Sequence, residues 1–227
     1  MRRAKIIGTG SYLPEKVLTN ADLEKIVETT DEWITTRTGI KERRISAADQ
    51  ATSDLAYEAA KKAMGSAKMD PKDIELIIVG TSSPDMLFPS TACIVQDKLG
   101  AVNAAAFDLS AACTGFNYAL ASAASFIESG LYNNVLVIGA DTLTKYLDWT
   151  DRNTCVLFGD GAGAVVLTAS TDGSGVLASH LGADGSGGKY LTMPGGGSRD
   201  PESKKRFICM DGKEVFKFAV RAFPSSI

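Results

Sequence analysis

The chain has 227 residues, 44% of them hydrophobic, which is enough for a substantial core in one or two units. Its net charge of −3 gives no reason to expect nucleic acid as a partner, and no apolar run approaches membrane-spanning length. The four cysteines show no paired spacing, which argues against a metal site or a disulfide framework and favours a reducing, cytoplasmic compartment.

Apolar runs alternate with helical patterns along the chain, which predicts βαβ units and a largely parallel sheet in an α/β fold. A strand is expected at residues 4–9, then a helix at 21–27 capped by Asn20, and the charge run 41–44 favours a solvated face. The apolar run 74–80 predicts a strand buried on both faces, and the helix 90–99 ends at Gly100. Before the run 74–80, a longer helix capped by Ser53 carries an apolar face of Leu55, Ala56, Ala59, Ala60, Ala63 and Met64.

A cysteine follows the next expected strand, residues 104–109, where small residues turn the chain into a helix at 113–129. Cys113 falls where that helix begins, and the free N–H groups and positive dipole there favour a thiolate. The helix is apolar on almost every side, which predicts that it is buried. A cysteine of this kind is often a buried structural residue, but strand-to-helix turns are where α/β enzymes display nucleophiles. The position therefore favours an enzyme that takes an acyl group on Cys113.

The rest of the chain contains one more buried strand, at residues 135–139, and two runs, 154–158 and 162–167, that flank the turn Gly159-Asp160-Gly161. That turn runs into a strand-like stretch, so it is not a nucleotide-binding loop. Residues 184–188 and 195–202 read as loops. The last element, at 213–223, is an amphipathic helix whose apolar side has nothing after it to cover it, so we expect the chain to be incomplete.

Three stretches together resemble one enzyme family: residues 107–116 around Cys113, residues 158–164 (FGDGAGA) and residues 31–40 (DEWITTRTGI). From Lys5 to about Phe223 the chain resembles the β-ketoacyl-[acyl-carrier-protein] synthase III enzymes. The resemblance implies a thiolase-like αβαβα layered fold, with a complete first half at residues 1–170 and a truncated second half at 171–227. It also implies a homodimer that starts fatty-acid synthesis.

The reaction implied by the resemblance has two steps. A short acyl group, with acetyl favoured, moves from coenzyme A to Cys113, and malonyl-acyl carrier protein then loses CO₂ and condenses with the acyl thioester. Coenzyme A is a substrate carrier here, and no separate cofactor is implied.

The resemblance assigns roles to further residues. Trp33 and Arg37 match a pair that holds the adenine of coenzyme A, chemistry that suits an indole and a guanidinium. Phe88 matches the aromatic that limits the acyl pocket across the dimer interface. The other matches are Arg152 on the nucleotide, Thr29, Met210, Gly212 and Phe216 along the substrate tunnel, and Lys217 and Arg221 on the helix that faces the carrier protein. From the residues alone, Trp33 could equally be a core indole, and Lys217 and Arg221 a solvated helix face.

The only histidine, His180, matches a non-catalytic strand position of the family. The family's catalytic histidine and asparagine lie beyond the end of this chain, so the 227 residues are expected to be inactive in condensation. Two alternatives remain open: another thiolase-fold condensing enzyme of quinolone or polyketide type, and a non-catalytic truncated fragment.

Overall fold

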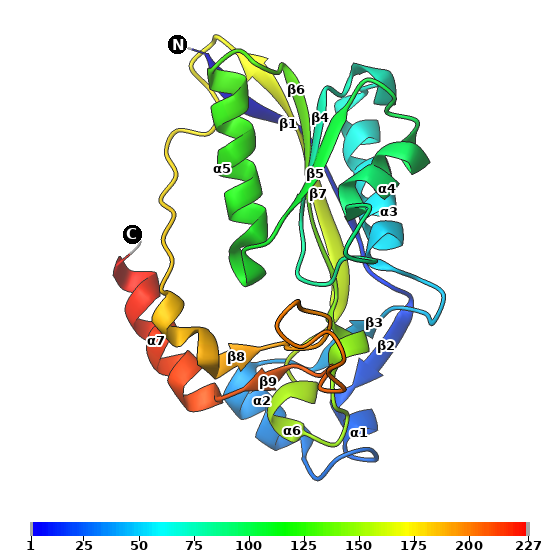
Figure 1. Ribbon diagram of the computed structural model, residues 1–227, viewed down its shortest axis with the longest axis vertical. Helices are drawn as coiled ribbons and strands as arrows, with labels where there is room; N and C mark the ends of the chain where they lie inside the picture. Colours follow the sequence, from blue (N-terminus) through cyan, green and yellow to red (C-terminus); the bar gives the residue numbers. More distant parts are fainter. Residues whose placement is uncertain (1, 226–227) are drawn as a thin grey trace. The chain divides into compact units, whose positions relative to one another are not determined.

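The chain folds into two units whose segments interleave along the sequence. The computed structural model describes residues 2–225, shown as a ribbon in Figure 1. One unit, called the sheet unit below, contains the chain up to Lys16, Arg44–Thr142 and Asp160–Ser179. The other, the helical unit, contains Val17–Arg43, Leu143–Gly159 and the chain from His180. Each of these units combines three separate segments of the chain, whereas the sequence analysis divides the chain once, at residue 170. That division stays a prediction.

A five-stranded sheet forms the sheet unit, in the spatial order β1 (Arg3–Tyr12), β7 (Asp160–Ser170), β6 (Asn134–Thr142), β4 (Leu76–Gly80) and β5 (Ala105–Leu109). β4 pairs in parallel with β5 and β6, but β7 is antiparallel to β6 and to β1. The expectation of a largely parallel sheet is therefore wrong for this edge. The chain between β6 and β7 returns to the same end of the sheet, which makes the two strands antiparallel.

Helices cover both faces of this sheet (Figure 1). α3 (Thr52–Ala67) and α4 (Thr91–Leu99) pack on one face with Ile77 and Val79 of β4, and α5 (Gly115–Glu128) packs on the other with Leu76 and Ile78. The alternation along β4 explains why its whole run is apolar, as expected for a strand buried on both faces. Asp108 of β5 accepts the Thr91 and Ala92 N–H groups, each at 2.7 Å, and so fixes the start of α4 against the sheet.

α5 buries only one side, which corrects the prediction of a helix buried all round. Ala119, Ala123 and Ile127 are buried against the sheet, whereas Asn117 and Ser125 on the same helix are exposed. The many alanines that suggested complete burial instead let the helix lie close to the strands. In the residues that the structure describes, α5 is thus a one-sided helix.

The start of α5 touches β4 through two glycines. A Cβ added at Gly80 would lie 2.6 Å from the carbonyl carbon of Gly115 and 2.9 Å from the backbone nitrogen of Phe116. No side chain can move aside to relieve a clash with backbone atoms. The head of α5 can therefore approach β4 only because position 80 carries no side chain.

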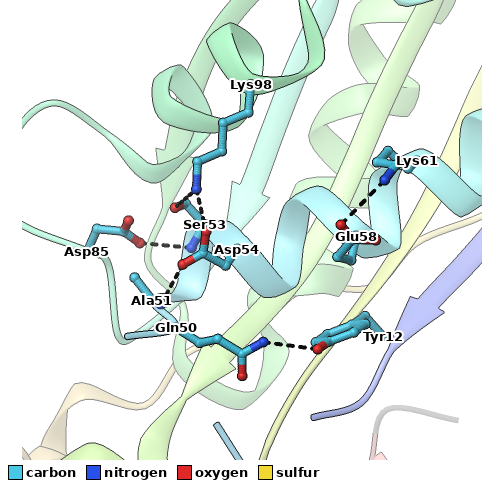
Figure 2. Close-up of polar contacts among 9 residues, drawn as sticks. All are labelled: Tyr12, Gln50, Ala51, Ser53, Asp54, Glu58, Lys61, Asp85 and Lys98. Atoms are coloured by element: carbon cyan, nitrogen blue, oxygen red, sulfur yellow. Dashed lines mark hydrogen bonds and ion pairs between the residues drawn. The ribbon is translucent and has the colours of Figure 1, made fainter. Parts of the chain in front are cut away.

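The two expected helix caps near the N-terminus fall on other residues. Thr19, not Asn20, caps α1 (Asn20–Leu23), because its hydroxyl accepts the Asp22 N–H and the Asp22 carboxylate accepts the Thr19 N–H in return. α3 begins one residue before Ser53, and Asp54 accepts the Ala51 N–H at 2.7 Å. Figure 2 shows that Ser53 instead donates its N–H to Asp85 and receives a bond from Lys98.

The helical unit surrounds a small core that Leu23, Ile34, Cys155 and Val156 form with partly buried Trp33 and Trp149. Its helices are α1, α2 (Asp31–Thr38), α6 (Arg152–Cys155) and α7 (Gly212–Ser225). Two short strand pairs accompany them, β2 (Lys16–Thr19) with β3 (Glu42–Ile45) and β8 (Leu191–Thr192) with β9 (Cys209–Met210). A one-turn 3₁₀ helix lies at Leu143–Tyr146, and a longer one at Gly185–Tyr190 replaces an expected loop. Further one-turn 3₁₀ helices, at Pro71–Asp73 and Ala112–Thr114, belong to the sheet unit.

Between Arg2 and Ser225, the structure contains no helix that is both long enough and apolar enough to cross a membrane.

The close contact at Gly80 can be tested by adding one methyl group. Gly80→Ala should lower the free energy of unfolding by about 2 kcal/mol, because the new Cβ collides with backbone atoms of α5. Urea unfolding followed by circular dichroism measures this loss. Gly163→Ala is the matched control in the same sheet, since a Cβ there meets nothing within 4 Å. Equal stability of the two variants would contradict the account of the contact.

Candidate functional site

Cys113 lies in a tight turn between β5 and α5, as the sequence predicts. A one-turn 3₁₀ helix, Ala112–Thr114, leads directly into α5, and Thr114 N–H and hydroxyl both donate to the Ala111 carbonyl, at 3.2 and 2.9 Å. Ala112 has φ of +45°, a left-handed conformation that an alanine adopts only at a cost. Backbone strain of this kind next to a cysteine is typical of strand-to-helix turns that expose a nucleophilic side chain.

The surroundings of Cys113 leave its sulfur accessible. The side chain is exposed, and Thr114, at the N-cap of α5, makes no side-chain hydrogen bond to the helix. Cys93 and Cys209 are exposed as well, so exposure alone does not single out Cys113. Burial raises the pKa of the fourth thiol, Cys155, which makes it the poorest nucleophile of the four.

A second constellation gathers in the helical unit around the indole of Trp33. Thr30 caps α2 by accepting the Trp33 N–H at 3.0 Å, and Gly39, at φ of +73°, ends the helix. Trp33 and Arg37 stand one turn apart on α2, and the guanidinium carbon of Arg37 lies 4.5 Å from the centre of the indole. The two residues that the resemblance pairs are therefore in contact with each other on α2.

Arg152, at the first position of α6, approaches the same indole. Its guanidinium carbon lies 5.2 Å from the centre of the Trp33 ring, and its Nη1 donates to the Glu28 carbonyl at 3.2 Å. An open groove of about 520 Å³ lies beside it, lined by Ile26, Val27, Glu28, Thr150, Asp151, Arg152 and Asn153. Two guanidinium groups and an indole next to a groove form a suitable place for a flat, anionic ligand. Trp33, Arg37 and Arg152 are called the clamp below.

A larger groove, of about 550 Å³, lies in the sheet unit and carries none of the predicted site residues. Tyr12, Asp49, Gln50, Asp54, Tyr57, Glu58 and Lys98 line it. Figure 2 shows several of these side chains bonded to one another, with Gln50 donating to Tyr12 at 3.0 Å and Lys98 paired with Asp54 at 2.6 Å. We therefore place the candidate ligand site at the smaller groove, where Arg152 lies beside an aromatic ring and a second cationic group.

The remaining predicted binding residues lie near the ends of other elements. The Thr29 hydroxyl, just before α2, is buried and has no hydrogen-bond partner among the described residues. Phe88, in the loop before α4, is 84% exposed. Met210 ends β9, and Gly212 and the exposed Phe216 belong to the first half of α7.

The two predicted carrier-protein contacts, Lys217 and Arg221, are exposed on α7. Lys217 pairs with Glu214 at 2.7 Å, and Arg221 donates its Nε to the Lys217 carbonyl at 3.1 Å. An exposed i,i+3 pair contributes little to stability, so Lys217 can exchange Glu214 for another acidic partner at small cost.

The expectation that His180 occupies a strand is wrong. His180 is exposed in an irregular segment, because β7 ends at Ser170 and no strand of the described residues pairs with positions 177–184. No cluster of acidic, cysteine and histidine side chains suited to a metal ion occurs among residues 2–225.

The sequence analysis missed two buried polar residues in the helical unit, Asn20 and Arg43. Arg43 is only 5% exposed, although its place in the charge run 41–44 suggested a solvated face. Successive side chains of a strand point to opposite faces, and in β3 Glu42 is exposed whereas Arg43 is turned inward. Asn20 was assigned to a helix cap, whereas its side chain points into the core and bonds to Arg43.

Comparisons with known proteins agree with this arrangement of fold and site. Residues 107–185 match the family model described as 3-oxoacyl-[acyl-carrier-protein (ACP)] synthase III. A β-ketoacyl-[acyl-carrier-protein] synthase III of Caldanaerobacter subterraneus is 63% identical over 98% of this chain and 69% of its own length.

Solved structures give the same result. A crystal structure of 3-oxoacyl-[acyl-carrier-protein] synthase III from Aquifex aeolicus matches with a TM-score of 0.90 and 54% identity, over 96% of this chain and 68% of that one. The priming β-ketosynthase of the R1128 polyketide pathway matches with a TM-score of 0.89 and 38% identity, over 96% and 66%. These matches confirm the thiolase-like α/β fold. With this level of identity across nearly its whole length, the chain belongs to the 3-oxoacyl-[acyl-carrier-protein] synthase III family.

Proposed function

We propose that this protein is an acyltransferase that starts fatty-acid synthesis by a decarboxylating condensation, with Cys113 as its nucleophile. The observation that carries the proposal is the exposed Cys113 in the strained turn between β5 and α5. The Cys113 thiolate attacks the carbonyl carbon of an acyl-coenzyme A, and the coenzyme A sulfur leaves and takes up a proton. The acyl group is then held as a thioester on Cys113.

In the second step, malonyl-acyl carrier protein loses CO₂, and the electron pair of the broken C–C bond forms an enolate. The enolate carbon attacks the acyl carbon on Cys113, and the cysteine sulfur leaves as a thiolate. The product is a 3-oxoacyl-carrier protein two carbons longer than the primer. The reaction needs no oxidant or reductant, and we propose no cofactor besides the coenzyme A thioester itself.

The clamp is the proposed site for the nucleotide of coenzyme A. An adenine ring can stack on Trp33 while Arg37 and Arg152 supply positive charge for the phosphates. Thr29, Met210, Gly212 and Phe216 are proposed to line the path of the pantetheine arm. Lys217 and Arg221 on α7 are proposed to receive the acidic carrier protein.

A homodimer is proposed from the apolar surface of the sheet unit. β5 is an edge strand of the sheet, and Leu87 and Phe88 in the loop between β4 and α4 are 81% and 84% exposed. Large exposed apolar side chains beside an open strand edge favour burial against a second copy. We also propose a cytoplasmic location, since all four cysteines are free.

The likeness to a polyketide priming synthase supports a second candidate of the same reaction type with a different primer or pathway. Phe88, a bulky side chain at the proposed end of the acyl pocket, favours a short primer. Rates with acetyl-, butyryl- and longer acyl-coenzyme A distinguish the two candidates.

Acyl transfer tests the proposed nucleophile. Incubation with acetyl-coenzyme A should add one acetyl group to Cys113, found by peptide mapping at neutral pH without reductant. Cys113→Ser should abolish this acetylation, whereas Cys93→Ser, which removes another exposed thiol, should leave it intact. Acetylation of Cys93 or Cys209 in the parent chain would overturn the assignment.

The clamp should control affinity and leave the chemistry unchanged. Arg37→Ala should raise KM for acetyl-coenzyme A about tenfold in the acyl-transfer step, because a cation–π contact and a phosphate partner are lost together. Its kcat should change little, the pattern expected when ground state and transition state lose the same contact. Lys25→Ala removes an exposed cation from the same unit and should have no effect. A fall in kcat at constant KM would contradict the proposed role.

We further propose that these 227 residues alone carry out only the first of the two steps, acyl transfer to Cys113, and do not catalyse the condensation. The enolate oxygen requires preorganised donors, each of which is worth about 10²–10³-fold in rate, and the single histidine, His180, is exposed in an irregular segment. The assay measures CO₂ release from malonyl-acyl carrier protein, with a full-length synthase III as the positive control. Turnover by the 227-residue chain that is comparable to the control would disprove this proposal.

A further inference from the structure

The core of the helical unit contains a buried arginine that binds neutral groups only. Arg43 donates to the Leu18 carbonyl at 3.2 Å, to Asn20 Oδ1 at 2.9 Å and to the Val156 carbonyl at 3.1 Å. Within residues 2–225 it forms no ion pair with a carboxylate, and its Nε has no partner. Burial lowers the pKa of Arg43, as expected for a cation removed from water. Burying a charge without an ion-pair partner lowers the stability of the fold. A buried arginine of this kind therefore invites the question of what its hydrogen bonds hold in place.

Asn20 extends this set of bonds to α2. Its side chain is 1% exposed, and its Nδ2 donates to Asp31 Oδ1 at 2.7 Å and to the Ile40 carbonyl at 2.8 Å. Asp31 is the first residue of α2, and Ile40 follows its last turn, so one amide group fixes both ends of the helix. The Asn20 Oδ1 accepts from Arg43, which leaves the amide with one possible orientation.

The two residues connect both elements that carry the clamp. Through Asn20 they hold α2, which carries Trp33 and Arg37, and through the Val156 carbonyl they hold the end of α6, which begins with Arg152. Asn20 and Arg43 contact none of the three clamp side chains in these bonds. They act on the Asp31 carboxylate and on the carbonyls of Ile40 and Val156, at the ends of the elements that present those side chains.

We propose that Asn20 and Arg43 are positioning residues that set the orientation of α2 and α6, and thereby bring Arg37 and Arg152 onto the indole of Trp33. An apolar pair of similar volume would fill the same space with no charge to bury, but it would not fix the direction of either element. The predicted effect on the affinity for coenzyme A rests on the proposed function, whereas the predicted effect on the geometry of the clamp does not.

The first readout is the fluorescence of Trp33, with Trp149→Phe as the background so that one indole remains. Asn20→Ser removes the bonds to Asp31 and Ile40 and should shift the Trp33 emission and its quenching by acrylamide, because the two guanidinium groups move away from the ring. Arg43→Lys keeps the charge but cannot form three divergent bonds, and it should give the same shift. It serves as the test variant if Asn20→Ser folds poorly. An unchanged Trp33 signal in folded variants would overturn the proposal.

The second readout is the affinity for coenzyme A, measured by titration calorimetry with the whole chain. Asn20→Ser should raise Kd about tenfold, the effect of losing a buried hydrogen-bonding group that supports the site. Thr142→Val is the matched control, since it removes a buried hydroxyl bonded to Thr52 at 2.9 Å in the sheet unit. It should lower stability to a similar extent and change neither Trp33 emission nor Kd.

A double variant separates positioning from a general loss of stability. If Asn20 acts through the clamp, Asn20→Ser should weaken coenzyme A binding far less in an Arg37→Ala background than in the parent. Independent, multiplying effects would overturn the proposal. If the parent chain binds no coenzyme A while its Trp33 signal still responds to Asn20→Ser, the proposed function fails and the positioning role stands.

Discussion

The contact between Gly80 and Gly115 is the constraint on which the sheet unit depends. The nucleophile turn ends with the head of α5 lying on β4, and the distance between them is possible only because position 80 carries no side chain. Asp108 fixes α4 from the same strand that leads to Cys113, because its carboxylate accepts two N–H groups of that helix. The turn is thus held in place by the backbone contact of α5 with β4 and by the fixed start of α4. The packed sheet around it maintains the strained backbone of Ala112.

The helical unit holds its functional side chains in place with buried polar groups. Its core is small, and short helices such as α6 have little apolar surface with which to hold their orientation. Directional hydrogen bonds from Arg43 and Asn20 fix the orientation of these helices, which apolar packing alone does not fix. The two units therefore illustrate two ways of placing a functional side chain, close backbone approach in one and a bonded cation in the other.

Much of the fold was predictable because the hydrophobic period is a local signal. The all-apolar run of β4, the face of α3 and the Gly100 end of α4 appear as the sequence predicts. One kind of error concerns groups whose partners lie far away in the chain. Nothing near residue 43 indicates that a carbonyl at Val156 will receive its side chain. The cap of α1 is a different error, because Thr19 and Asp22 form a capping box that is a local signal. The i, i+4 spacing predicts the contact of Trp33 with Arg37, whereas Arg152 joins them only through tertiary structure.

The bond from Arg152 to Glu28 joins residues that are 124 positions apart, and this has a consequence for the order of events on the ribosome. At typical synthesis rates, roughly 6–25 s pass between the emergence of the two residues. During that interval Arg43 has no Val156 carbonyl to bind, whereas β4, β5 and β6 can already pair with one another. β1 waits longer still, because its partner in the sheet, β7, follows Arg152 in the chain. All three clamp residues are therefore synthesised before the five-stranded sheet can be completed.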